Sequence, residues 1–188
     1  MPPGGRPPGA FFHLKRGYSA ERTPVPAPHC EHMIAAICLA LLYLASALLA
    51  WIDLRRGIIP NWVNLAIAVI GLARAAILDG WTAALGAGCE GAVIGAIVFL
   101  LRRLYFKLRK FHGLGLGDVK LLAASGIWIG VAGVPVQLLV ASLAALAAAG
   151  VMQLAGRTMT RQTSLPFGPF LALGLLVALA LQQHGWIN

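Results

Sequence analysis

The stretch MIAAICLALLYLASALLAWI, at residues 33–52, is twenty residues long and carries no charge. A transmembrane helix needs ~20 predominantly apolar residues to cross the hydrocarbon core of a bilayer. Over all 188 residues, 59% are hydrophobic and 11% are charged, whereas soluble domains carry about 25% charged residues. These proportions predict a membrane protein.

Further apolar runs follow at residues 62–78, 82–101, 119–134, 135–154 and 166–181. Gly133 and Pro135 are expected to separate the fourth run from the fifth by a tight turn. The predicted fold class is an all-α, polytopic membrane helix bundle of about six transmembrane helices, with residues 33–188 as one domain. Residues 1–32 are rich in Pro and Gly, so we expect a disordered arm or a non-native extension before a true start at Met33.

Basic residues follow the first, third and fifth apolar runs and indicate the topology. They are Arg55 and Arg56, then Arg102, Arg103, Lys107, Arg109 and Lys110, then Arg157 and Arg161. The positive-inside rule places these loops in the cytoplasm and the C-terminus outside. Alternation then places the N-terminus outside as well, although its arm is basic, and this conflict stays open. A net charge of +9 would suit nucleic acid, but clustering between apolar runs favours a lipid bilayer and no nucleic acid as partner.

The chain has only six acidic residues, and three of them lie in the arm or in an outer loop. The other three, Asp53, Glu90 and Asp118, lie near or within the membrane, where an ionisable side chain is costly and indicates function. Glu90 falls near the middle of the third run, among small residues. We expect it to be protonated and hydrogen-bonded between helices, the alternative being a role beside the other two acids.

Asp53 ends the first helix and Asp118 begins the fourth, so both are expected at the cytoplasmic face. Two carboxylates that share a site cannot both ionise easily. One can then keep its proton while the other activates a water, as in an aspartic peptidase. The structural alternative is that each caps a helix or pairs with a nearby base, Asp53 with Arg55 or Arg56 and Asp118 with Lys120.

Five neighbours are expected to support this pair. Gly115 and Gly117 allow backbone geometries closed to other residues and so give a flexible approach for a substrate strand. Pro60 and Asn61 begin the second helix and are expected to aim Asp53. Lys120 either lowers a carboxylate's proton affinity or reaches lipid headgroups.

Three stretches together resemble the bacterial type IV prepilin peptidases, which are aspartic proteases of the inner membrane. They are DLRRGIIPN at residues 53–61, GLGLGDVKLLAASGIWIG at 113–130 and LPFGPFLALG at 165–174. The resemblance covers nearly the whole chain from about Met33 onward. It implies that Asp53 and Asp118 are catalytic and that Gly115 and Gly117 are the glycines of the family's GxGD motif.

The resemblance also implies a substrate, a type IV prepilin or a type II secretion pseudopilin. The basic leader of that protein would be cleaved at the cytoplasmic face of the inner membrane. Many family members carry paired CxxC motifs that accompany N-methylation, and Cys30, Cys38 and Cys89 form no such pair. We therefore expect the short, peptidase-only form, with no metal or organic cofactor and with methylation left to another protein.

Two rivals from other classes stay open. The same aspartates could bind a cation or relay protons in a small transporter or channel subunit. The chain could also be an inactive scaffold for secretion or pilus assembly.

Overall fold

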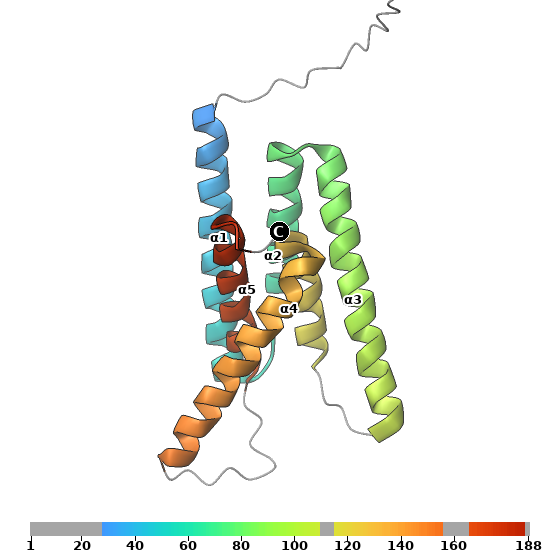
Figure 1. Ribbon diagram of the computed structural model, residues 1–188, viewed down its shortest axis with the longest axis vertical. Coiled ribbons are helices and arrows are strands. Elements are labelled where there is room, and N and C mark those ends of the chain that lie inside the picture. Colours follow the sequence, from blue (N-terminus) through green and yellow to red (C-terminus); the bar gives the residue numbers. More distant parts are fainter. Residues whose placement is uncertain (1–27, 110–114, 156–165, 187–188) are drawn as a thin grey trace, which may run out of the picture.

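The computed structural model describes residues 28–109, 115–155 and 166–186, and these residues form five helices (Figure 1). The helices are α1 Pro28–Arg56, α2 Asn61–Leu78, α3 Trp81–Arg109, α4 Leu116–Leu154 and α5 Gly168–Gln183. In this part of the chain four helices, α1 to α4, are long and apolar enough to cross a membrane, and α5 is a shorter apolar helix. The prediction of an all-α polytopic membrane bundle is confirmed.

Helix α4 consists of two segments, so the described residues contain six helical segments, where about six transmembrane helices were predicted. The break lies at Gly130, with φ 65° and ψ −179°, and not at Gly133 or Pro135 as predicted. Residues with a side chain rarely adopt a positive φ, so a glycine can break the helix here. Gly133 and Pro135 lie inside the second segment.

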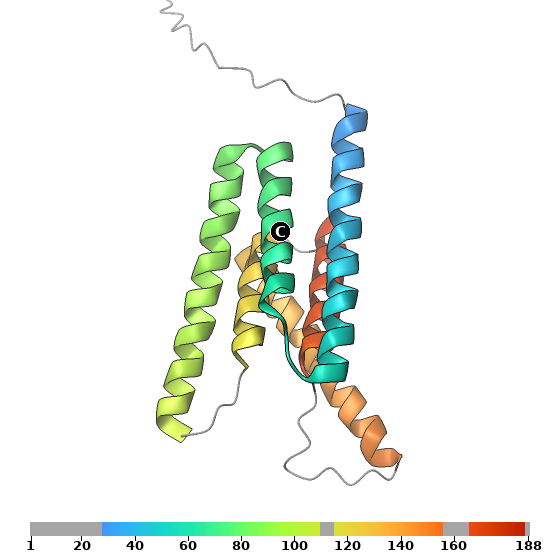
Figure 2. The ribbon, with the colours of Figure 1, turned by 180° about the vertical axis from the view of Figure 1, so that it is seen from behind.

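The segments alternate in direction, so one end of the bundle holds the C-terminal ends of α1 and α3, the N-terminal ends of α2 and α5, and both ends of α4 (Figures 1 and 2). The elbow of α4 lies part-way along α2 and α3, and its second segment turns back toward the same end as its start. Residues far apart in sequence are thereby brought to one face.

Glycine permits the close crossing of α3 and α4. A Cβ built on Gly126 would meet the side chain of Ile94 and would lie 3.2 Å from the Cα of Gly91. A Cβ on Gly91 would in turn lie 2.7 Å from the backbone oxygen of Ala123. Small residues at such positions let helix backbones approach in a membrane, where packing drives helix association.

Two helix bounds differ from the predicted runs. Helix α1 begins at Pro28, so the last residues of the predicted arm are helical, while residues 1–27 lie outside the described part of the chain. Helix α3 continues to Arg109, beyond the apolar run that ends at Leu101. The basic residues that follow the run therefore extend the helix past the apolar span.

Candidate active site

A short loop joins the end of α1 to the start of α2. The backbone N–H of Gly57 donates to the backbone oxygen of Asp53 at 2.7 Å, and Gly57 has φ +62°. A glycine in this left-handed conformation commonly ends a helix. The chain then passes through Ile59 to Pro60, the N-cap of α2, and to Asn61, its first residue. Pro60 and Asn61 therefore start α2, as predicted.

The carboxylate of Asp53 lies at the N-terminus of α5. Asp53 is 5% exposed, and its Oδ2 accepts a hydrogen bond from the backbone N–H of Gly168 at 3.0 Å. The first N–H groups of a helix have no partner within the helix, and the helix dipole favours a negative charge there. The start of α5 therefore holds Asp53 in place.

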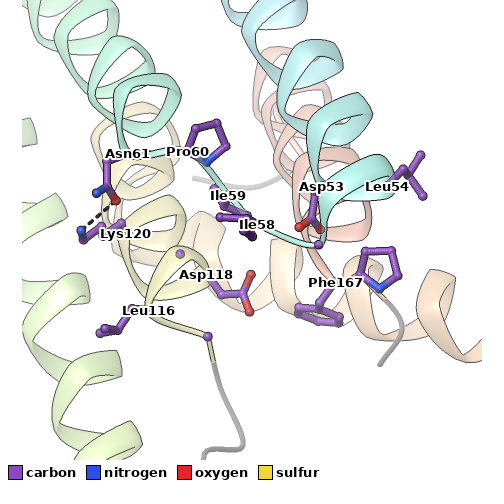
Figure 3. A pocket seen from close by; sticks show the side chains of 14 residues that line it. Asp53, Leu54, Ile58, Ile59, Pro60, Asn61, Leu116, Asp118, Lys120 and Phe167 are labelled. Atoms are coloured by element: carbon purple, nitrogen blue, oxygen red, sulfur yellow. Dashed lines mark hydrogen bonds between the residues drawn. The ribbon is translucent and has the colours of Figure 1, made fainter. Parts of the chain in front are cut away.

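Asp118 lies in the first turn of α4, and its carboxylate faces the same space as that of Asp53 (Figure 3). The N-cap is Gly115, not Asp118, and the Asp118 carboxylate interacts with the backbone of Gly115. A side chain at the third helical position often bonds back to the N-cap in this way. The carboxylates of Asp53 and Asp118 are also close enough to interact electrostatically.

The two glycines before Asp118 are explained by close packing. Gly115 has φ −64° and ψ 144°, an extended conformation open to any residue, and Gly117 is helical. A Cβ on Gly115 would lie 3.2 Å from Oδ2 of Asp118, and a Cβ on Gly117 would lie 2.8 Å from that of Ile59. The predicted reason, unusual backbone geometry, is therefore wrong for these two glycines. They leave room for the aspartate and for the α1–α2 loop.

Two hydrogen bonds join the start of α4 to the start of α2. Nζ of Lys120 donates to Oδ1 of Asn61 at 2.9 Å, and Nδ2 of Asn64 donates to the backbone oxygen of Gly117 at 3.2 Å. The first of these bonds is visible in Figure 3. Lys120 and Asn61 thus contact each other, and both contribute to the placement of Asp118.

Replacing Lys120 by Met is expected to reduce the activity of this site by less than about tenfold, because one exposed hydrogen bond is lost while the Asn64 bond remains. The matched control is Lys107→Met, which removes the same charge from the exposed end of α3. Initial rates of substrate cleavage for both variants would measure the effect. A complete loss with Lys120→Met alone would place the lysine in the chemistry and contradict this interpretation.

A cavity of about 910 Å³ opens between these helix ends. It is lined by the seven residues predicted for the site: Asp53, Pro60, Asn61, Gly115, Gly117, Asp118 and Lys120. Ligand sites typically measure ~300–1,000 Å³, so a peptide segment can be accommodated. The other lining residues are mostly apolar: Leu54, Gly57, Ile58, Ile59, Leu116, Pro166 and Phe167.

The sequence prediction missed Gly168 as a partner of Asp53. The resemblance includes the PFGPF stretch, but it does not imply the contact of its glycine with the aspartate. A Cβ on Gly168 would lie 2.6 Å from Oδ2 of Asp53, so only glycine fits beside this carboxylate without displacement. The glycine between two prolines at a helix start was the only signal in the sequence.

Two of the three bases named as alternative partners of the aspartates, Arg55 and Lys120, have other contacts. The guanidinium of Arg55 lies 4.3 Å from the ring centroid of Trp51, and Lys120 bonds Asn61. Both aspartates do contact donors at helix N-termini, which agrees with capping as well as with catalysis. Two carboxylates around one cavity are suited to activating a water, and their catalytic role stays a prediction.

Among the described residues, no group of His, Cys, Asp and Glu could hold a metal ion.

Comparison with known proteins adds independent information. The type IV leader peptidase family matches residues 37–150 of this chain. Similar proteins include the prepilin leader peptidase/N-methyltransferases of Burkholderia pseudomallei strain K96243, with 40% identity over 139 residues, and of Escherichia coli K12, with 35% identity over 143 residues. No solved structure matches the chain.

The matched regions cover much of this chain but only part of each relative. They span 72% of this chain and 44% of the Burkholderia protein, and 74% of this chain and 60% of the Escherichia coli protein. The matched family region contains both aspartates and the break in α4.

Proposed function

This chain belongs to the type IV leader peptidase family, and on that premise we propose that it is a membrane-embedded aspartic endopeptidase. Its substrates are type IV prepilins or type II secretion pseudopilins, from which it removes the basic leader peptide. The observation that carries this proposal is the pair Asp53 and Asp118, which interact across one cavity at the ends of two helices. No organic or metal cofactor takes part in the proposed reaction.

In the proposed mechanism a water lies between the two carboxylates. The ionised aspartate takes a proton from this water as it attacks the scissile carbonyl carbon, and the protonated aspartate donates a hydrogen bond to the carbonyl oxygen. The tetrahedral intermediate then breaks at the C–N bond, and the leaving nitrogen receives a proton from the dyad. The Gly168 N–H occupies Oδ2 of Asp53, which leaves Oδ1 for the water.

We place the site at the cytoplasmic face of the bacterial inner membrane. Arg55 and Arg56 close the last turn of α1, the helix that carries Asp53. The basic residues at the end of α3 lie at the same end of the bundle (Figure 2). Basic residues beside membrane spans are enriched on the cytoplasmic side, which supports this orientation.

The proposal is tested by expressing the chain together with a full-length prepilin in a bacterium that lacks its own prepilin peptidase. Mass spectrometry of the membrane fraction would detect a pilin shortened by its basic leader, with a new N-terminus at the leader junction. If several prepilins and pseudopilins stay intact beside a correctly inserted chain, the peptidase function is refuted and the transporter and scaffold alternatives are favoured.

A further inference from the structure

The break in α4 exposes backbone groups within the membrane-spanning bundle. Gly130 interrupts the helix, so the hydrogen-bond ladder of α4 stops and starts again there. Orphan N–H and C=O groups at such a position lack water in a bilayer and must find partners in the protein. The structure shows a side-chain partner on each side of the break, one from α3 and one from α5.

Glu90 of α3 binds the backbone of the segment that follows the break. Its Oε2 accepts a hydrogen bond from the backbone N–H of Val131 at 3.0 Å. A Cβ on Gly130 would lie 2.6 Å from the same Oε2, so the glycine also makes room for the glutamate. The prediction that Glu90 is hydrogen-bonded between helices is thereby confirmed. An oxygen of either the acid or the carboxylate can accept this bond.

Gln182 of α5 binds the backbone of the segment that precedes the break. Its Nε2 donates a hydrogen bond to the backbone oxygen of Ile129 at 2.7 Å. The peptide groups on the two sides of Gly130 are thus bound by opposite neighbours, Glu90 from α3 and Gln182 from α5. Together these two side chains form a clamp on the break.

The first segment of α4 connects this clamp to the candidate active site, so a tilt at the break displaces Asp118. Twelve residues separate Gly130 from Asp118, which is about 18 Å of helix. A tilt of about 5° at the break would move the far end by about 1.6 Å over that length. A displacement of about 1 Å in a catalytic group can cost on the order of 100-fold in rate.

Helix α5, which provides Gln182 of the clamp, also connects the two aspartates. Helix α5 donates the Gly168 N–H to Asp53 at its start and holds Ile129 through Gln182 at its end. Between these points the buried Gln137 donates to Oγ of Ser125 at 3.0 Å and to the backbone oxygen of Leu171 at 3.1 Å. The segment that carries Asp118 is therefore tied to the helix that holds Asp53.

We infer that Glu90 and Gln182 are positioning residues, which fix the break at Gly130 and so hold Asp118 in register with Asp53. This inference rests on the proposed peptidase function. Neither side chain lines the cavity, so they act through the first segment of α4 and not on the substrate.

The first test compares Glu90→Leu with Glu90→Gln in the full chain, reconstituted in vesicles. Leucine cannot accept the Val131 N–H, whereas the glutamine carbonyl can. We expect Glu90→Leu to lower kcat for prepilin cleavage about tenfold to 100-fold with KM unchanged, and Glu90→Gln to retain kcat. Gln182→Leu is expected to behave like Glu90→Leu, and Gln183→Leu, at the exposed next residue, is the matched control.

The second test measures position without relying on activity. Spin labels on Leu54→Cys at the end of α1 and on Leu116→Cys at the start of α4, two exposed positions, report the distance between these helix ends after the native cysteines are replaced by Ala. We expect Glu90→Leu to shift or broaden this distance and Glu90→Gln to leave it unchanged. The inference is overturned if Glu90→Leu alters neither kcat nor the distance, or lowers kcat while the distance stays unchanged. If the intact chain cleaves nothing, the proposed function fails, while the distance still tests the clamp.

Discussion

Replacing either Asp53 or Asp118 by Asn is expected to lower the rate of prepilin cleavage by about 10²- to 10⁴-fold. Asparagine keeps the size of the side chain but can neither take a proton from the water nor supply one to the leaving nitrogen. Proton transfer by a positioned side chain contributes a factor of this order. Both side chains line the same cavity, so each variant should fail for the same reason.

The control for these variants is Asp79→Asn. Asp79 is the exposed C-cap residue of α2, at the end of the bundle away from the cavity, and its loss removes the same charge. Initial rates in vesicles containing equal amounts of inserted protein would compare the three variants. If Asp53→Asn or Asp118→Asn cleaves at the rate of the intact chain, that aspartate has no part in the chemistry.

Replacing Gly168 by Ala is expected to reduce kcat by about 100-fold. The new Cβ would lie 2.6 Å from Oδ2 and 3.0 Å from the carboxyl carbon of Asp53, so the carboxylate must move away from the start of α5. The hydrogen bond from the Gly168 N–H would lengthen or break at the same time. A shift of about 1 Å in a catalytic group has an effect of this size.

Gly86→Ala is the matched control, since a Cβ on this glycine of α3 meets nothing within 4 Å. It should leave cleavage unchanged. Rates for both variants should be measured at saturating prepilin, with circular dichroism showing equal helix content. Wild-type kcat for Gly168→Ala would mean that the position of Asp53 does not depend on α5.

The membrane fold could be predicted from the sequence because uncharged apolar runs of about 20 residues are typical of transmembrane helices. The run at residues 33–52, for example, lies within the 29-residue helix α1. The break in α4 was predicted at Gly133 and Pro135 but lies at Gly130. The side chains that bind the backbone on either side of it, Glu90 and Gln182, are 40 and 52 residues away in sequence. Such contacts leave no local pattern.

The candidate site was predicted in part. Asp53 and Asp118 could be chosen because acidic residues are few and costly in a membrane span. Their supporting glycines were also chosen, but Gly117 is needed for its packing against Ile59, and Gly168 was not chosen as a partner of Asp53. The fold brings the α1–α2 loop and the start of α5 to these positions, and spacing along the chain does not reveal that approach.

The central claim, that Asp53 and Asp118 act as one dyad, is tested most directly by the cleavage rate of the double variant Asp53→Asn with Asp118→Asn. The measurement uses the reconstituted chain and one full-length prepilin, beside the intact chain and the two single variants. Residues that act as a unit are strongly non-additive, so the account predicts a double variant no slower than the slower single variant. A double variant slower by the product of the two single effects would show independent roles and contradict the dyad.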